Sequence, residues 1–248
     1  MGLICLYAGH ADEARRYTQM GIAHSEALAH PFSLSLSLTI AGIMLAETGD
    51  CEDAIRVCRR CIELCEAQSL PFFMALAILY EGIALVRQGH YDRGQANLER
   101  SRQILAATGA RNSHGHMGAW QAIALAHQGR FDEARREADF GAQRARETGE
   151  LLQLPWALHA RGIAERLDPN AVEGAAEHWF HAAIDEARSH GNRLIELRAA
   201  NSLAGLWQSQ GKRHEARELL APIFGWFTEG FDTQDLKDAK ALLDELQG

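Results

Sequence analysis

Small and apolar residues recur along this chain with a period of 40 residues. The most regular marker is a glycine at an expected turn, found at Gly9, Gly49, Gly89 and Gly129. Two columns of small residues flank these turns: Gly2, Gly42, Gly82, Ala122, Gly162 and Ala204 before them, and Ala14, Ala54, Gly94, Ala134 and Ala216 after them. Self-similarity at a period of about 20–50 residues is typical of stacked repeat architectures. The pattern therefore predicts helical pairs that pack mainly on their neighbours.

The apolar stretches between these markers predict long helices. Pro31 and Pro71 each open one, because the missing N–H of proline costs nothing in a first turn. Gly109 and Gly149 end two others, since glycine readily takes the left-handed conformation found after a helix. The expected helices are Ala11–Ala29, Phe32–Glu47, Phe72–Gln88, Tyr91–Ala107, Ser113–Gln128, Phe131–Glu147, Leu154–Leu167, Leu194–Gln210, Arg213–Phe224 and Gln234–Gln247.

The period changes once along the chain. The first small column steps from Gly162 to Ala204, which is a spacing of 42 rather than 40 residues. We interpret the change as a two-residue insertion in the turn between Asp168 and Glu173. With that insertion, Ala176 falls into the second small column.

The two ends of the chain differ from the repeats between them. Met1–Ala8 aligns only with the second half of a first helix, so we expect a fragment of a longer protein whose first repeat is frayed or paired with another chain. Gln234–Gln247 has one apolar stripe and one charged face, which is typical of a terminal capping helix. The predicted domains are a repeat array over residues 1–224 and a linker with the capping helix over residues 225–248.

Composition narrows the classes of partner. The net charge of −8 disfavours direct nucleic-acid binding, which needs a basic face. We find no apolar run that approaches the roughly 18–20 residues needed to span a bilayer, and no secretory signal. Five cysteines, an odd number, favour a reducing compartment over a disulfide framework. We therefore expect a cytoplasmic protein without a cofactor or a membrane partner.

The spacing across each turn resembles the tetratricopeptide (TPR) motif. A small residue in one helix is followed 12 residues later by a small residue in the next, as from Gly42 to Ala54. Ala176, Phe180 and Ala183 also resemble that motif's second helix. The period of 40 departs from the family's usual period of about 34. The resemblance implies an all-α fold, a right-handed α-solenoid of about six TPR-like helical hairpins with a C-terminal capping helix.

A second resemblance concerns the end of the chain. Ala216–Leu246 looks like the C-terminal end of large bacterial signalling proteins that join a nucleotide cyclase or DNA-binding domain, a STAND-type AAA ATPase and a TPR tail. This sequence contains no GxxxxGK[ST] motif and no paired metal-binding aspartates in a strand context. The resemblance therefore implies a regulatory or sensor tail and not the catalytic domains.

In TPR arrays the first helix of each hairpin lines a concave groove, and the resemblance assigns that role to eleven positions here. They are Thr39, Glu47, Arg87, His116, His127, Trp156, His159, Arg166, Arg198, Asn201 and Gln208. The early repeats are apolar there and the later ones are polar and basic. We expect a partner that is an acidic peptide, another protein or a preceding domain of the same polypeptide, with room for self-association through the uncapped first repeat. The alternative is a metabolite sensor, which a closed pocket lined by Trp120, Trp156 and histidines would favour.

Three cysteines offer the strongest metal-like pattern. Cys58, Cys61 and Cys65 fall within reach of one face of a predicted helix. Thiolates at such spacing hold zinc or iron–sulfur clusters in some proteins. The alternative, which we favour, is that they fill packing columns, where a free cysteine behaves as a small hydrophobe.

Other residues carry weaker chemical signals. Two histidine pairs stand close in sequence, His114 with His116 and His178 with His181. Neither pair has the HExxH spacing of a zinc protease, and the chain has no nucleophile-elbow motif. The DEAR runs Asp12–Arg15 and Asp132–Arg135 are interpreted as solvated helix starts, with acidic residues at the positive end of the helix dipole. We therefore predict no catalytic residues, no metal site and no enzymatic activity.

Overall fold

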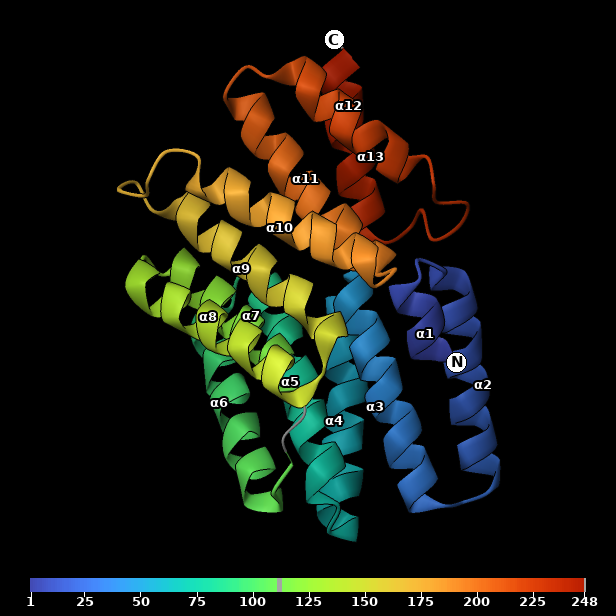
Figure 1. The fold of residues 1–248 in the computed structure, drawn as a ribbon. Coiled ribbons are helices and arrows are strands. Elements are labelled where there is room, and N and C mark those ends of the chain that lie inside the picture. The colour runs from blue at the N-terminus through green and yellow to red at the C-terminus, as the bar shows by residue number, and fades with distance from the viewer. Residues whose placement is uncertain (111–112, 248) are drawn as a thin grey trace. The chain divides into compact units, whose positions relative to one another are not determined.

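The computed structural model describes residues 1–110 and 113–247. Those residues form α-helices joined by short connections and contain no β-strand, and successive helices pack as hairpins (Figure 1). The predicted all-α class of TPR-like helical hairpins is therefore confirmed. The chain divides into two compact units, Met1–Leu6 with Ala11–Arg111 and Tyr7–His10 with Asn112–Gly248.

Unit 1 contains the early hairpins, in which each helix from α2 to α5 packs on the next along the chain. Its helices are α1 (Gly2–Tyr7), α2 (Ala11–Ala27), α3 (Pro31–Thr48), α4 (Cys51–Gln68), α5 (Pro71–Arg87) and α6 (Tyr91–Thr108). In addition α3 contacts α5, so first helices stack on first helices.

Unit 2 repeats that arrangement. Its helices are α7 (His114–His127), α8 (Phe131–Thr148), α9 (Leu154–Leu167), α10 (Ala175–Ser189), α11 (Arg193–Ser209), α12 (Arg213–Phe224) and α13 (Gln234–Gln247). A short 3₁₀ turn, Leu151–Gln153, precedes α9. The last helix, α13, packs against both α11 and α12, as expected for a capping helix.

The local signals in the sequence place the helix ends. Pro31 and Pro71 occupy the first turns of α3 and α5. Gly109 and Gly149 follow α6 and α8 with φ of +74° and +75°, in the left-handed region that glycine tolerates best. The expected helices agree with the observed ones to within two residues at each end.

Within a hairpin, a small residue of the first helix receives a side chain of the second. A Cβ added at Gly42 would lie 2.6 Å from Cys58 Sγ, and one added at Gly162 would lie 2.5 Å from the ring of Phe180. Both receiving side chains are fully buried. The absence of a Cβ in the first helix therefore sets how closely the two helices approach.

One apolar helix, α3, corrects an expectation from sequence. Among the described residues, α3 is long and apolar enough to cross a membrane by length and composition alone, contrary to our finding of no such run. Within unit 1, 56% of this helix is buried, and it packs against α2, α4 and α5. A helix covered on several sides is expected to be apolar nearly all round, and this burial accounts for its composition.

The contact at Gly162 predicts the outcome of a glycine-to-alanine pair. Gly162→Ala should destabilise the protein by up to about 2 kcal/mol, because overpacking against Phe180 costs about 1–3 kcal/mol and helix propensity returns about 1 kcal/mol. Gly205→Ala in α11 is the control, since a Cβ there meets nothing within 4 Å, and it should stabilise by about 1 kcal/mol. Urea unfolding of both variants measures the difference. Equal midpoints for the two variants would contradict the role of the Gly162 contact.

Candidate functional site

The predicted groove residues of unit 1 lie on α3 and α5 and are mostly buried. Thr39 is 2% exposed, and its hydroxyl donates to the Ser35 carbonyl over 2.8 Å. Glu47 is fully buried within the unit. Arg87, at the end of α5, is half-buried and hydrogen-bonds to Cys51. Of these three, only Arg87 offers charge near the surface.

In unit 2, aromatic side chains from α7 and α9 pack into one cluster. Trp120 Nε1 donates to His116 Nε2 over 3.1 Å, so the His116 proton resides on Nδ1 when this ring is neutral. The His116 ring lies 4.8 Å from the ring of Trp156. All three side chains are buried, so two of the predicted groove residues, His116 and Trp156, contact each other and not solvent.

Arg198 of α11 joins this cluster to the capping helix. Its guanidinium lies 4.6 Å from the ring centre of Trp156 and 5.8 Å from that of Trp120. It pairs with Asp235 of α13 through two hydrogen bonds, Nε to Oδ1 over 3.0 Å and Nη2 to Oδ2 over 2.7 Å. Asn201 adds a bond from Nδ2 to the Asp235 carbonyl over 2.8 Å. The charge of Arg198 is therefore used to hold α13 on α11.

His159 lies under the same face and stays neutral. Its Nε2 is 2.9 Å from the Ser202 hydroxyl, and its ring is 4% exposed. Burial and, to a smaller extent, the positive charge of Arg198 lower the pKa of His159 to about 3. A proton on this histidine would be strongly disfavoured at neutral pH.

The remaining predicted residues of unit 2 are nearer to solvent. Arg166, in the last turn of α9, and His127, at the end of α7, are exposed. Burial and the neighbouring Arg166 charge hold the pKa of His127 below its usual value. Gln208 is half-buried and donates to Glu245 over 2.8 Å. Among the predicted residues of unit 2, Arg166 therefore supplies the exposed positive charge.

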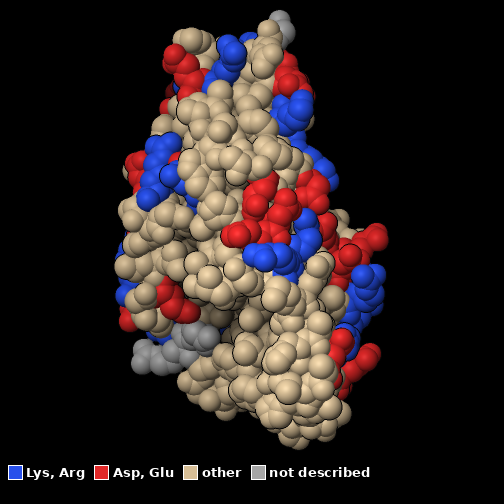
Figure 2. Space-filling model, turned by 90° about the vertical axis from the view of Figure 1, so that its right-hand side faces the viewer, with Lys and Arg blue, Asp and Glu red and all other residues tan. Residues whose placement is uncertain are grey.

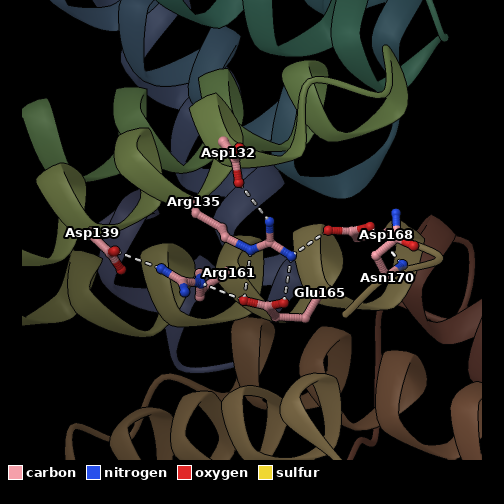
Figure 3. Close-up of polar contacts among 7 residues, drawn as sticks. All are labelled: Asp132, Arg135, Asp139, Arg161, Glu165, Asp168 and Asn170. Carbon is pink, nitrogen blue, oxygen red and sulfur yellow. Dashed lines mark hydrogen bonds and ion pairs between the residues drawn. The ribbon is translucent and has the colours of Figure 1, made fainter. Parts of the chain in front are cut away.

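A pocket of about 960 Å³ opens on the outer side of unit 2, where the starts of α8 and α10 flank the end of α9. Arg135 of α8 bonds to Glu165 of α9, Nε to Oε1 over 3.1 Å and Nη2 to Oε2 over 2.9 Å, and to Asp168 over 2.5 Å (Figure 3). Arg161 bonds to Glu165 over 3.0 Å and to Asp139 over 2.6 Å. These contacts tie α8 to α9 and to the connection that follows α9.

The interpretation of the second DEAR run, Asp132–Arg135, as a solvated helix start describes Asp132 but not Arg135. Asp132 is 85% exposed at its side chain, as expected of a solvated helix start. Arg135, however, is 20% exposed and belongs to the ion-pair network. The signal that could have found the network lies in the repeat, because Glu165 stands in a column that is otherwise apolar or cysteine.

Elsewhere the surface charges are intermixed. Figure 2 shows acidic and basic side chains beside one another on the face drawn there, and not separated by sign. Many are short-range helix pairs such as Arg56 with Asp53, over 2.9 Å. Exposed pairs of this kind contribute little to stability.

Comparison with known proteins gives a fold and no family. No protein-family model and no curated protein matches the sequence. Among solved structures, the apo form of the quorum sensor NprR from B. thuringiensis matches with a TM-score of 0.59 at 12% identity. The match covers 99% of this chain and 68% of the NprR chain. BtubC (BKLC) from P. vanneervenii has a TM-score of 0.57 at 13% identity, with coverages of 96% and 89%. A Podosopora anserina kinesin light chain with nearly identical TPR-like repeats has a TM-score of only 0.46 at 16% identity, with coverages of 88% and 98%.

The fold is a TPR-like helical repeat. Identities this low establish the fold alone. The cyclase or ATPase context inferred from Ala216–Leu246 receives no test from these structures.

The cysteines of this TPR-like array occupy packing positions. Cys58 fills the space beside Gly42, and Cys61 Sγ lies 3.5 Å from the Ser35 carbonyl. At the equivalent place one hairpin later, the Ser101 hydroxyl donates to the Ala75 carbonyl over 2.7 Å. Within the described residues, no group of three or more His, Cys, Asp or Glu is arranged to hold a metal ion. Burial raises the pKa of Cys58, and that of Cys61 to about 12, so both thiols are protonated at neutral pH.

The raised pKa of Cys61 predicts a loss of stability in alkali. The Cys61 thiol ionises near pH 9 in the unfolded chain and near pH 12 in the folded one. The contribution of the protonated thiol to the free energy of unfolding is therefore complete below pH 9 and is lost as the pH rises from 9 to 12. Between pH 10 and 11, the unfolding free energy of the Cys61→Ser variant should fall less steeply than that of the wild type, by about 1.4 kcal/mol per pH unit. Urea titrations of both proteins at several pH values measure the slopes. Identical slopes would mean that Cys61 ionises alike in both states.

The Arg198–Asp235 pair predicts strong non-additivity. Asp235→Leu should cost about 3–5 kcal/mol, because it leaves a buried guanidinium without its carboxylate. The double variant Arg198→Leu/Asp235→Leu should recover much of that loss, since an apolar pair needs no compensating charge. Urea unfolding of the wild type, both single variants and the double variant completes the cycle. Additive losses would show that the two side chains do not act as a pair.

Proposed function

We propose that this chain is a non-catalytic scaffold for protein interaction, and that it serves as the regulatory or sensor tail of a larger bacterial signalling ATPase or nucleotide cyclase in the cytoplasm. The TPR-like fold supports the scaffold role. The resemblance of Ala216–Leu246 supports the larger context, and a quorum sensor with the same fold is consistent with a sensor role. An in-frame cyclase or ATPase domain encoded ahead of Met1 would support that context, and a stop codon there would contradict it.

The first helices of unit 2, α7, α9 and α11, carry the predicted groove residues, and we call the surface around Arg166 and His127 on these helices the inner face. We propose that this inner face binds an acidic peptide or an acidic surface of a neighbouring domain. The observation that carries this proposal is the exposed Arg166 beside His127, on first helices whose other predicted polar groups largely bond within unit 2. Burial lowers the pKa of Arg166. An incoming carboxylate would pair with this arginine and would favour protonation of the adjacent histidine.

The metabolite-sensor alternative gains no support from the aromatic cluster. Trp120, Trp156 and His116 were expected to line a closed pocket under that alternative. They contact one another and are buried, so these side chains fill the space between them.

A charge reversal tests the inner face. Peptides selected from a random display library on the wild-type chain should include acidic binders whose affinity falls at least tenfold with Arg166→Glu, because an attraction becomes a repulsion. Arg56→Glu, at an exposed position on α4, is the control and should leave the affinity within twofold. Fluorescence anisotropy with the selected peptides measures the affinity of each variant.

A selection that yields no binder sensitive to Arg166→Glu would contradict the assignment of the inner face. Circular dichroism of each variant should match that of the wild type, which separates lost binding from lost folding.

A further inference from the structure

At the outer pocket of unit 2, the chain departs from its repeat pattern in two ways, in the identity of one residue and in the length of one connection. Three residues after each small residue of the first helix, the column reads Cys5, Leu45, Leu85, Leu125, Glu165 and Trp207. Glu165 is the only charged residue in that column, and it is 7% exposed. The second departure is the connection after α9, which runs over residues 168–174, whereas those after α7 and α11 run over 128–130 and 210–212.

The buried charges are not needed to join these helices. Ile55 and Leu85 stand at the positions of Arg135 and Glu165 two hairpins earlier, and there an apolar pair lines the equivalent outer pocket, of about 590 Å³. Because an apolar replacement of a buried ion pair is often neutral or stabilising, the pair at Arg135 and Glu165 is weak evidence of a role in stability. What the pair supplies is a polar floor and an anchor for the longer connection, because Arg135 also holds Asp168.

The longer connection forms one wall of the pocket. Asp168 is held by Arg135 and accepts from the Asn170 N–H over 2.8 Å (Figure 3). Beyond this anchor, Val172 also lines the pocket with 78% of its surface exposed. Phe131 and Trp179 contribute further apolar surface, and Arg161 lies 5.2 Å from the ring centre of Trp179. Loops that a rigid scaffold holds in place often carry binding residues.

Four basic and four acidic side chains line this pocket, and Asp132 and Glu133 are among the acidic ones. Arg135 and Arg161 are paired with carboxylates on the floor, and Arg130 is paired with Glu133. Arg136 also lines the pocket and is exposed, and its charge acts on the nearby Glu133 without a hydrogen bond between them. The starts of α8 and α10, both long helices, lie at the same pocket and add partial positive charge.

We propose that this outer pocket is a second docking site, which takes a short peptide segment of a protein partner that carries an acidic residue next to a large apolar one. The carboxylate pairs with Arg136, and the apolar side chain packs against Val172 and Trp179. Arg136, Val172 and Trp179 lie on second helices and on the connection after α9, so these contacts are separate from the inner face and do not depend on Arg166.

The test uses the full chain and a second peptide selection, carried out on the Arg166→Glu variant so that inner-face binders are disfavoured. Selected peptides should share an acidic residue beside a large apolar residue. Their affinity, measured by fluorescence anisotropy, should fall at least tenfold with Arg136→Glu and with Val172→Asp. Arg56→Glu is the matched control, since Arg56 stands at the position of Arg136 two hairpins earlier, and it should change affinity less than twofold.

A selection that returns no binders, or binders that Arg136→Glu and Val172→Asp leave unchanged, overturns the proposal. Because both substituted side chains are exposed, unfolding is not expected, and circular dichroism of the variants checks this directly. Failure here leaves the inner-face result standing, and the reverse also holds, since the two selections respond to different arginines.

Discussion

The close approach of two helices inside each hairpin is the constraint on which the rest of this fold depends. The first helix lacks a side chain, or has only a methyl group, where the second helix inserts one. The inserted residue varies from Cys58 beside Gly42 to Phe180 beside Gly162, and its size is matched to the space left for it. Dense packing of this kind makes the small residue more restrictive than the larger one. A cysteine at such a place is explained by its volume and needs no metal.

Between hairpins, complementarity matters more than the identity of each residue. Arg59 of α4 pairs with Glu81 of α5 over 2.9 Å, and at the same two positions two hairpins later Asp139 pairs with Arg161 over 2.6 Å. The charges are exchanged while the contact is kept. Outer positions therefore tolerate changes that the small columns do not, and new surface chemistry can arise there without disturbing the hairpin contact.

The sequence was sufficient for the helices and insufficient for the fate of their polar side chains. Turn glycines and first-turn prolines are local signals, so helix ends could be predicted to within two residues. Whether Arg198 faces a binding partner or its own chain depends on Asp235, which lies 37 residues away in the capping helix. Nothing in the sequence pattern indicates that these two residues meet. Periodicity tells which way a residue faces, and it does not tell what covers that face. Glu165, in contrast, could have been identified from the sequence, because it is the charged residue in a repeat column that is otherwise apolar or cysteine. Only a comparison between the repeats shows this.

A repeat protein contains its own reference sequence, and this gives departures from the repeat a physical meaning. At Arg198 the departure is accounted for within the fold, because Asp235 consumes the charge and fixes the capping helix on the array. At Glu165 the charge is also paired, but the residues it supports lead outward to the exposed Val172 and to the exposed Arg136. Stability can account for the first departure, since a terminal face must be covered. At the second, the chain's other hairpins show that leucine can take the place of Glu165, and recognition of a partner, as proposed for the outer pocket, would give this charge a role beyond stability.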